Sequence, residues 1–259
     1  MRLTVLGSGS TVPHPRRTSS AYWLETSGGN ILLDCSATAP HQMAEIGVDW
    51  SNLDAIWISH FHMDHVGGLG PLLAGTKHAP QMQERQKPLT IYGPVGFEKL
   101  FDGISSVRDY KFREQPFPVN VIEITTMQKF EIVAEVEAVA MSTEHTPESH
   151  AIHIRDGETT VVYSADTGFD GKLAALATNV DLMLLECAFV HQKPNKKHLI
   201  LSEAIHLIRK AKPRRAMLTH FYPEWDDVDF GKEVELLSPM CEVIQAEDGL
   251  TLQLTMDNG

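Results

Sequence analysis

Four metal-ligating side chains crowd into six residues of this chain, in the stretch His60-Phe61-His62-Met63-Asp64-His65. The stretch follows an apolar, strand-like run at 55–58 and precedes the glycine-rich start of a helix at 66–69. Alternate residues of an extended segment face the same way, so His60 and His62 are placed to hold one ion together. Asp64 and His65 lie where the chain turns into the helix and are placed to reach a second ion. Imidazole with carboxylate suits zinc, iron, manganese or nickel.

The alternative is a polar loop that is rich in histidine by chance. The chain has 13 histidines among 259 residues, and such a pattern is expected by chance roughly once in several hundred chains of this kind. Four ligands do not complete two sites, so a metal site requires more of them downstream. Three residues qualify because each follows a strand-like run: His145, Asp166 and His220. An isolated Asp before Thr-Gly is usual in a turn or helix cap, but the shared position at strand ends favours ligands.

The apolar pattern predicts a mixture of strands and helices. Predicted strands are rich in Val, Ile and Leu and are bounded by turn residues; they lie at 3–6, 30–33, 55–58, 89–92, 119–124, 132–141, 159–164, 181–185, 215–218 and 250–254. Predicted helices lie at 37–46, 66–74, 95–105, 169–177, 200–211 and 230–237. This order favours an α/β (α+β) chain in which helices cover two packed sheets. We expect one domain over residues 1–259, with the polar segment 75–88 as a surface loop or lid.

Charge and cysteine content limit the function classes. The formal net charge is −12, whereas proteins that grip a polynucleotide backbone are usually basic, so the balance argues against extended nucleic acid as a partner. The three cysteines, Cys35, Cys187 and Cys241, form no CxxC pair and are expected to be buried thiols. No signal-peptide pattern or membrane-length apolar run is found. The expected location is the cytoplasm.

The order of these motifs resembles a known group of enzymes. HFHMDH at 60–65, then a single His, an Asp after a small-residue strand and a final Thr-His-Phe at 219–221 are similar to the metallo-β-lactamase-fold hydrolase superfamily. The opening, LGSGSTVP at 6–13, together with Arg17, Ser20, Leu33-Asp34-Cys35 and His41-Gln42-Met43, resembles the ribonuclease Z branch. The likeness extends from about residue 3 to 222. It implies a four-layer αββα sandwich, the metallo-β-lactamase fold.

The resemblance also implies how the ligands are divided. In such a site one ion would be held by His60, His62 and His145, the other by Asp64, His65 and His220, and Asp166 would bridge them. Zinc is the expected metal of both divalent ions, with manganese or iron as alternatives. Asp64 would also serve catalysis by orienting or deprotonating the attacking water.

His198 is the remaining catalytic candidate. Ribonuclease Z-like proteins have a His at a matching place, where it stabilises phosphate and helps the leaving group depart. Here His198 lies in a basic stretch with Lys193, Lys196 and Lys197. The resemblance therefore implies a phosphate-facing loop, against the alternative of a solvated basic loop.

These features predict a dinuclear-metal phosphodiesterase that uses a metal-bound hydroxide, with His198 as general acid. Ribonuclease Z carries a long tRNA-clasping arm between its third His motif and the bridging Asp. Here His145 and Asp166 are only 166 − 145 = 21 positions apart, so a small or nucleotide phosphodiester is the expected substrate. One alternative is an ester, lactone or thioester hydrolase in which Tyr222 matters. A non-catalytic binding protein is another. A homodimer is also expected from the relatives.

Overall fold

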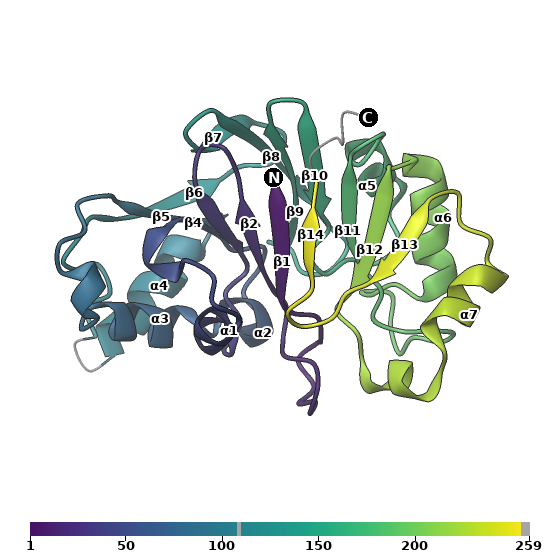
Figure 1. Ribbon diagram of the computed structural model, residues 1–259, viewed down its shortest axis with the longest axis horizontal. Helices are drawn as coiled ribbons and strands as arrows, with labels where there is room; N and C mark the ends of the chain where they lie inside the picture. The colour runs from purple at the N-terminus through teal and green to yellow at the C-terminus, as the bar shows by residue number, and fades with distance from the viewer. Residues whose placement is uncertain (108–109, 255–259) are drawn as a thin grey trace.

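The computed structural model describes residues 1–107 and 110–254. Within these residues the strands form two mixed sheets of seven strands that pack face to face (Figure 1). The first sheet has the order β14-β1-β2-β3-β4-β5-β6, with β1 (Arg2–Gly7), β2 (Ala21–Glu25), β3 (Asn30–Leu33), β4 (Leu53–Trp57), β5 (Leu89–Pro94), β6 (Val119–Ile124) and β14 (Thr251–Gln253). The second has the order β13-β12-β11-β10-β9-β8-β7, with β7 (Lys129–Val133), β8 (Val136–Ser142), β9 (His150–Asp156), β10 (Thr159–Tyr163), β11 (Leu182–Glu186), β12 (Arg215–Thr219) and β13 (Glu242–Gln245).

Helices cover the outer face of each sheet, which confirms the predicted four layers (Figure 1). The first sheet is covered by α1 (Ala39–Ile46), α2 (Met63–Val66), α3 (Leu69–Thr76) and α4 (Phe97–Ser106). The second is covered by α5 (Gly171–Leu176), α6 (Leu201–Ala211) and α7 (Phe230–Leu236). Short 3-10 turns are η1 (Trp50–Asn52), η2 (Pro80–Met82) and η4 (Pro223–Asp227).

Strand β4 shows why the layers form. Successive side chains of a strand point to opposite faces, so Ala55 and Trp57 enter the core between the sheets, whereas Ile56 enters the core beneath the helices. All five residues of β4 are buried. A strand that is covered on both faces needs apolar side chains on both, which accounts for the unbroken apolar run seen in the sequence.

Two predicted elements are each two elements in the structure. The run at 132–141 is not one strand: β7 and β8 pair antiparallel across a turn in which Glu135 has φ 61°. This turn contains no Gly, Pro or Asn, so the sequence has no signal for it. The predicted helix at 66–74 is α2 and α3, separated at Gly67 and Gly68. The strands β2, β9 and β13 were not predicted at all.

The segment 75–88 is a surface loop, but it is not a lid over the candidate ligands. Met82 is buried, and the guanidinium of Arg85 donates hydrogen bonds to the backbone carbonyls of Ser51 and Leu53 at 2.8 and 2.7 Å. Leu53 is the first residue of β4, whereas the HFHMDH stretch follows the last residue. The loop is therefore fastened at the end of β4 opposite to the HFHMDH stretch.

The structure bears on two further expectations. Cys35 and Cys187 are buried free thiols as predicted, and Cys241 is a free thiol that is partly exposed. No helix among the described residues has the length and apolar content that a membrane crossing requires.

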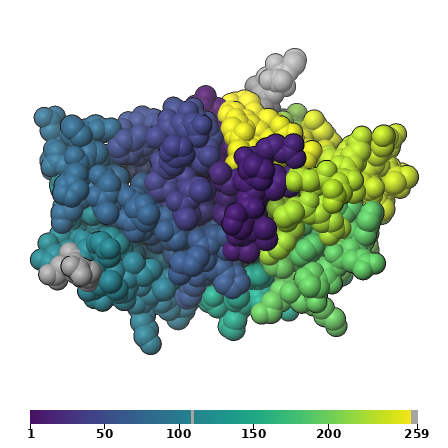
Figure 2. Space-filling model, turned by 90° about the horizontal axis from the view of Figure 1, so that it is seen from below, coloured from purple at the N-terminus to yellow at the C-terminus, as the bar shows by residue number. Residues whose placement is uncertain are grey.

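The ends of several strands meet at one edge of the molecule. Strands β10, β11 and β12 are parallel, and β8 runs the same way as β10 because both are antiparallel to β9. At this edge the amide of His150 donates to the carbonyl of Ser59 at 3.0 Å, which joins the second sheet to the first. Seen from below, both halves of the chain adjoin a central N-terminal segment (Figure 2). The residues that follow β4, β8, β10 and β12 are thereby brought together.

Candidate metal centre

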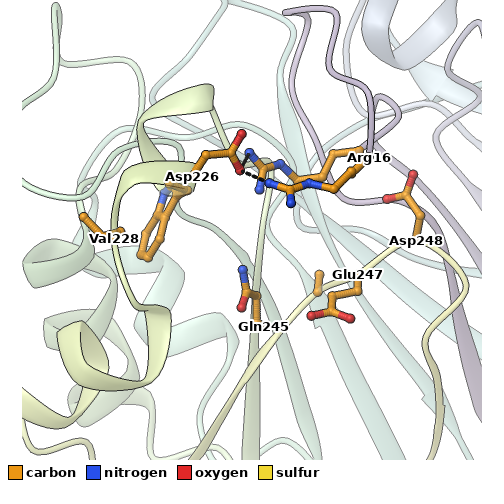
Figure 3. A pocket seen from close by; sticks show the side chains of 9 residues that line it. Arg16, Asp226, Val228, Gln245, Glu247 and Asp248 are labelled. Carbon is orange, nitrogen blue, oxygen red and sulfur yellow. Dashed lines mark hydrogen bonds and ion pairs between the residues drawn. The ribbon is translucent and has the colours of Figure 1, made fainter.

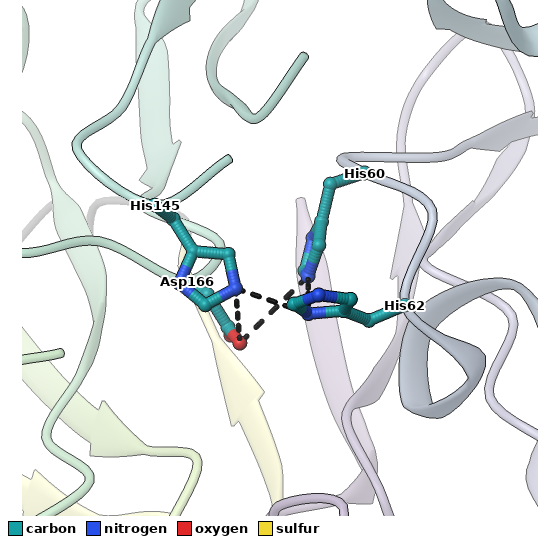
Figure 4. A group of neighbouring side chains, drawn as sticks. All are labelled: His60, His62, His145 and Asp166. Atoms are coloured by element: carbon teal, nitrogen blue, oxygen red, sulfur yellow. Dashed lines mark hydrogen bonds and ion pairs between the residues drawn. The ribbon is translucent and has the colours of Figure 1, made fainter. Parts of the chain in front are cut away.

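One group of ligand atoms comes from three different loops. His60 and His62 follow β4, His145 follows β8, and Asp166 follows β10 (Figure 4). One ligand atom from each of these four residues lies within 4.8 Å of the others. The Nδ1 atom of His62 is 3.1 Å from the Nε2 atoms of both His60 and His145. These donor atoms converge at the spacing that a shared cation requires.

A second group shares Asp166 with the first. Its other members are Asp64, His65 and His220, and one ligand atom from each again lies within 4.8 Å of the rest. The Nε2 atoms of His65 and His220 lie 3.2 and 3.3 Å from the Asp166 carboxylate. All four residues are buried. The structure thus assembles all seven candidate ligands and divides them as the sequence resemblance implies.

Two buried atoms of the cluster are placed to bind a cation. His65 Nε2 and Asp166 Oδ1 are buried and lack a hydrogen-bond partner among the described residues. Buried polar atoms are almost always paired, and an unpaired nitrogen that faces an unpaired carboxylate oxygen is satisfied by a metal ion between them. Histidine and carboxylate ligands without cysteine suit zinc, iron or manganese.

A further ring of residues fixes the orientation of the ligand imidazoles. Partners of the four Nδ1 atoms are Asp34 for His65 at 2.7 Å, Ser59 for His60 at 3.0 Å, the Lys197 carbonyl for His145 at 3.0 Å and Ser20 for His220 at 2.9 Å. Each of these imidazoles therefore presents Nε2 to the cluster. Such outer contacts set the tautomer of a ligand His and raise its basicity.

Asp34 is a functional residue that sequence reasoning did not single out. It follows β3, is fully buried and has φ 57°, which is uncommon for a residue other than glycine. Its carboxylate accepts hydrogen bonds from His65, Tyr163 and both the amide and the hydroxyl of Ser59, all at 2.7–2.8 Å. Because the Ser59 hydroxyl in turn accepts from His60, Asp34 orients ligands of both groups. The only sequence signal was its place in Leu33-Asp34-Cys35.

Burial favours the neutral form of most of the candidate ligand histidines. It lowers the pKa of His60 and His145, and that of His220 to about 3. Burial also opposes ionisation of Asp166, but His220 and His65 outweigh it and hold the Asp166 pKa well below its usual value. For His65, burial is outweighed by the carboxylates of Asp166 and Asp34, which raise its pKa. Neutral imidazole and ionised carboxylate are the forms that bind metals.

His198 lies against the cluster and is held by a second residue that the sequence did not reveal, Glu186. The Nδ1 atom of His198 donates to Glu186 Oε1 at 2.9 Å, and its ring stacks on that of His220 with centroids 5.5 Å apart. Burial lowers the pKa of His198, but the hydrogen bond and charge of Glu186 outweigh it and raise the pKa to about 9. The raised pKa favours the protonated imidazole. Because Nδ1 is bound to Glu186, Nε2 is the ring nitrogen left to donate a proton.

Glu186 ties three loops together. Its two carboxylate oxygens accept the backbone amides of Thr167, Ala188 and Leu199 at 2.7, 3.2 and 3.1 Å, besides the His198 ring. The same loops also meet at Gly168, where a Cβ atom would lie 2.0 Å from the Lys196 carbonyl oxygen. Only glycine permits this approach. The loop bearing Asp166 is thereby locked to the loop bearing His198.

The predicted basic, phosphate-facing loop is only partly supported. Lys193 does not serve there, because its ammonium is bound to Glu203 at 2.5 Å and to the His198 carbonyl at 2.9 Å. It fastens its own loop to the start of α6. Lys196 and Lys197 are exposed and line a shallow pocket beside His145.

A separate pocket of about 420 Å³ is lined by residues that support His220 indirectly (Figure 3). It contains no residue of the cluster, and its arginines, Arg16 and Arg17, are already paired with Asp226 at 3.1 and 2.8 Å. Asp248 accepts four hydrogen bonds from Ser8 and Thr18. These contacts hold the β1–β2 connection in place, and this connection carries Ser20, the partner of His220.

Two packed mixed sheets between helical layers, with a His/Asp cluster at one edge, define a metallo-β-lactamase-fold protein. The crystal structure of the metallo-β-lactamase-fold protein YhfI from Bacillus subtilis superposes with a TM-score of 0.81 at 24% identity, covering 97% of this chain and 99% of that one. Human tRNase Z, short form, superposes with a TM-score of 0.78 at 21% identity, covering 99% and 100%.

Sequence comparison narrows this class to one family. The family model described as anti-Pycsar protein Apyc1 matches residues 1–237, and the chain belongs to this family. Ribonuclease Z of Agathobacter rectalis is 33% identical over 126 residues, which is 49% of this chain and 39% of that protein. The chain thus spans about two fifths of the length of that relative. The resemblance to ribonuclease Z-like, metallo-β-lactamase-fold proteins is confirmed.

Proposed function

We propose that the protein is a dinuclear-metal phosphodiesterase. His60, His62 and His145 would hold one ion, and Asp64, His65 and His220 would hold the other, with Asp166 shared. Zinc is the metal we propose, and manganese or iron are the alternatives. The observation that carries the proposal is the pair of four-ligand groups that share one carboxylate, with His198 packed against them and held by Glu186. When bound, such a pair of ions activates water and clamps both oxygens of a displacement.

The chain's own residues divide the remaining work. Asp64 is buried, and burial raises the pKa of its carboxyl. It is therefore a stronger base than an ordinary aspartate and suits orienting or deprotonating the attacking water. His198 donates a proton from Nε2 to the departing oxygen, while Glu186 holds the ring in place and stabilises its cationic form. Asp34 keeps His60 and His65 turned toward the ions.

A small substrate fits the shape of the chain. The residues between His145 and Asp166 are taken up by the hairpin of β9 and β10, which leaves no arm to clasp an RNA. The net charge of −12 also disfavours a long anionic polymer. A small or nucleotide phosphodiester, such as a cyclic nucleotide, is the substrate class we propose.

The test is hydrolysis of bis-p-nitrophenyl phosphate by the metal-loaded protein and by its His62→Ala variant. We expect two equivalents of metal in the wild-type protein. In the variant we expect activity to fall by about 100-fold or more, because removal of the His62 imidazole costs one ion of the pair. Equal rates for the two proteins would refute the proposal.

The second candidate is an ester, lactone or thioester hydrolase. It is favoured by Tyr222, whose ring centroid lies 6.0 Å from that of His220, because a hydroxyl there could assist at a carbonyl polarised by the ions. The His198→Ala variant separates the candidates. A phosphodiesterase loses activity on phosphodiesters, whereas a lactonase retains activity on lactones.

A further inference from the structure

Two aromatic rings form a wall beside His198. The ring centroids of Phe189 and Tyr222 lie 4.7 Å apart, and they lie 6.2 and 5.8 Å from the His198 ring. Both side chains are partly exposed, unlike the buried aromatic residues of the two cores. The His198 ring therefore contacts both the candidate ligands His145 and His220 and the two rings of this wall.

The backbone holds the wall rigidly. The amide of Phe189 donates to the Leu199 carbonyl at 3.2 Å, and its carbonyl accepts from Leu201 at 3.0 Å. The amide of Tyr222 donates to the Ala188 carbonyl at 3.1 Å. Glu224 accepts the amides of the two residues that follow Phe189, at 3.1 and 3.2 Å. A surface that is fixed before binding loses little entropy when a ligand settles on it.

We propose that Phe189 and Tyr222 are a stacking platform for a flat, unsaturated ring of the substrate, with a nucleobase as the class that fits. This inference rests on the proposed function, in which His198 protonates the departing oxygen. The wall beside His198 would then hold the ring of the group that carries this oxygen. Lys193, on the same loop as Phe189, is neutralised by Glu203, so this cation is not free to hold a second phosphate, and the wall offers a ring face. Base-on-aromatic stacking is the interaction that such a surface provides.

The experiment compares two ligands that differ only in the base, uridine 5′-monophosphate and ribose 5-phosphate. Their dissociation constants are measured by calorimetry on the metal-loaded wild-type protein and on the Phe189→Leu, Tyr222→Leu and Tyr222→Phe variants. Tyr110→Leu is the control, because this exposed ring stacks on Phe112 in a different part of the molecule. We expect the wild-type protein to prefer the nucleotide by about 10- to 100-fold.

In the two Leu variants of the wall this preference should fall to within a few fold of one, whereas Tyr222→Phe and Tyr110→Leu should keep it. The inference is overturned if the wild-type protein shows no preference, if the Leu variants retain it, or if they weaken both ligands equally, because the rings would then only support His198. Loss of the preference in Tyr222→Phe would overturn stacking in favour of a role for the hydroxyl. Hydrolysis of bis-p-nitrophenyl phosphate, followed in parallel, judges the proposed function separately.

Discussion

Replacing Glu186 with Gln tests whether one buried carboxylate both stabilises the fold and raises the pKa of the proposed general acid, His198. The carboxylate accepts four hydrogen bonds, from the His198 ring and from the amides of Thr167, Ala188 and Leu199. A glutamine offers one oxygen and one NH2 group, so donors on one side lose their acceptor. Each unsatisfied buried donor costs roughly 1–3 kcal/mol, and relief of the buried charge offsets part of this loss. We expect the free energy of unfolding to fall by about 2–4 kcal/mol.

The effect on catalysis follows from the pKa of His198. Burial lowers this pKa, whereas the hydrogen bond and charge of Glu186, followed by the charges of Asp166 and Asp64, raise it to about 9. His198 acts in its protonated form, so in the wild-type protein the acid is lost as the pH rises through about 9. In Glu186→Gln the opposing effect of burial remains, and the loss moves to lower pH. At pH 8 we expect a rate about 100-fold lower for a substrate that needs a general acid.

The assay exploits the leaving group. A dinucleoside monophosphate expels a sugar alkoxide that needs a proton, whereas bis-p-nitrophenyl phosphate expels a phenolate that leaves unaided. The first rate should fall about 100-fold, and the second should change only a few fold. Glu203→Gln is the matched control, because Glu203 fastens the same loop through Lys193 without touching His198. Equal losses on both substrates, or an unshifted pH profile, would refute the reasoning.

Three further predictions concern the ions and their supports. Metal loading should release protons, because a proton and an ion compete for Nε2 of His65, whose pKa is raised; affinity should therefore fall as the pH falls, and calorimetry in buffers of different ionisation enthalpy checks this. Asp34→Asn should weaken metal binding by about 10- to 100-fold in competition with a chromophoric chelator, and unchanged affinity would contradict the role of Asp34. Gly168→Ala should lower the free energy of unfolding by about 1–3 kcal/mol, measured in urea. Gly171→Ala, where a Cβ meets nothing within 4 Å, is its control, and equal losses in the two would count against loop locking at Gly168.

The candidate ligands and several strands could be predicted from the sequence alone. The HFHMDH stretch predicts a metal site because four ligand-type residues fall within six positions. The direction of side chains in an extended or helical segment then indicates which of them can act together. Strands β3 and β6 were predicted with their observed bounds, since runs of Val, Ile and Leu end there at turn residues. The sequence also predicted that His145, Asp166 and His220 follow strands, and the structure brings them into the two groups that the family resemblance implies.

Only the tertiary structure decided what surrounds those ligands. Asp34 and Glu186 each stand alone in the sequence, far from the residues they hold, and parallel strands bring their loops to one edge of the molecule. The turn between β7 and β8 contains no Gly, Pro or Asn, so only the antiparallel pairing of the two strands revealed it. The sequence placed Lys193 in a basic loop, but the structure pairs its ammonium with Glu203 in the first turn of α6. Contacts between distant segments depend on how sheets stack and strands order themselves, and local side-chain pattern does not encode that directly.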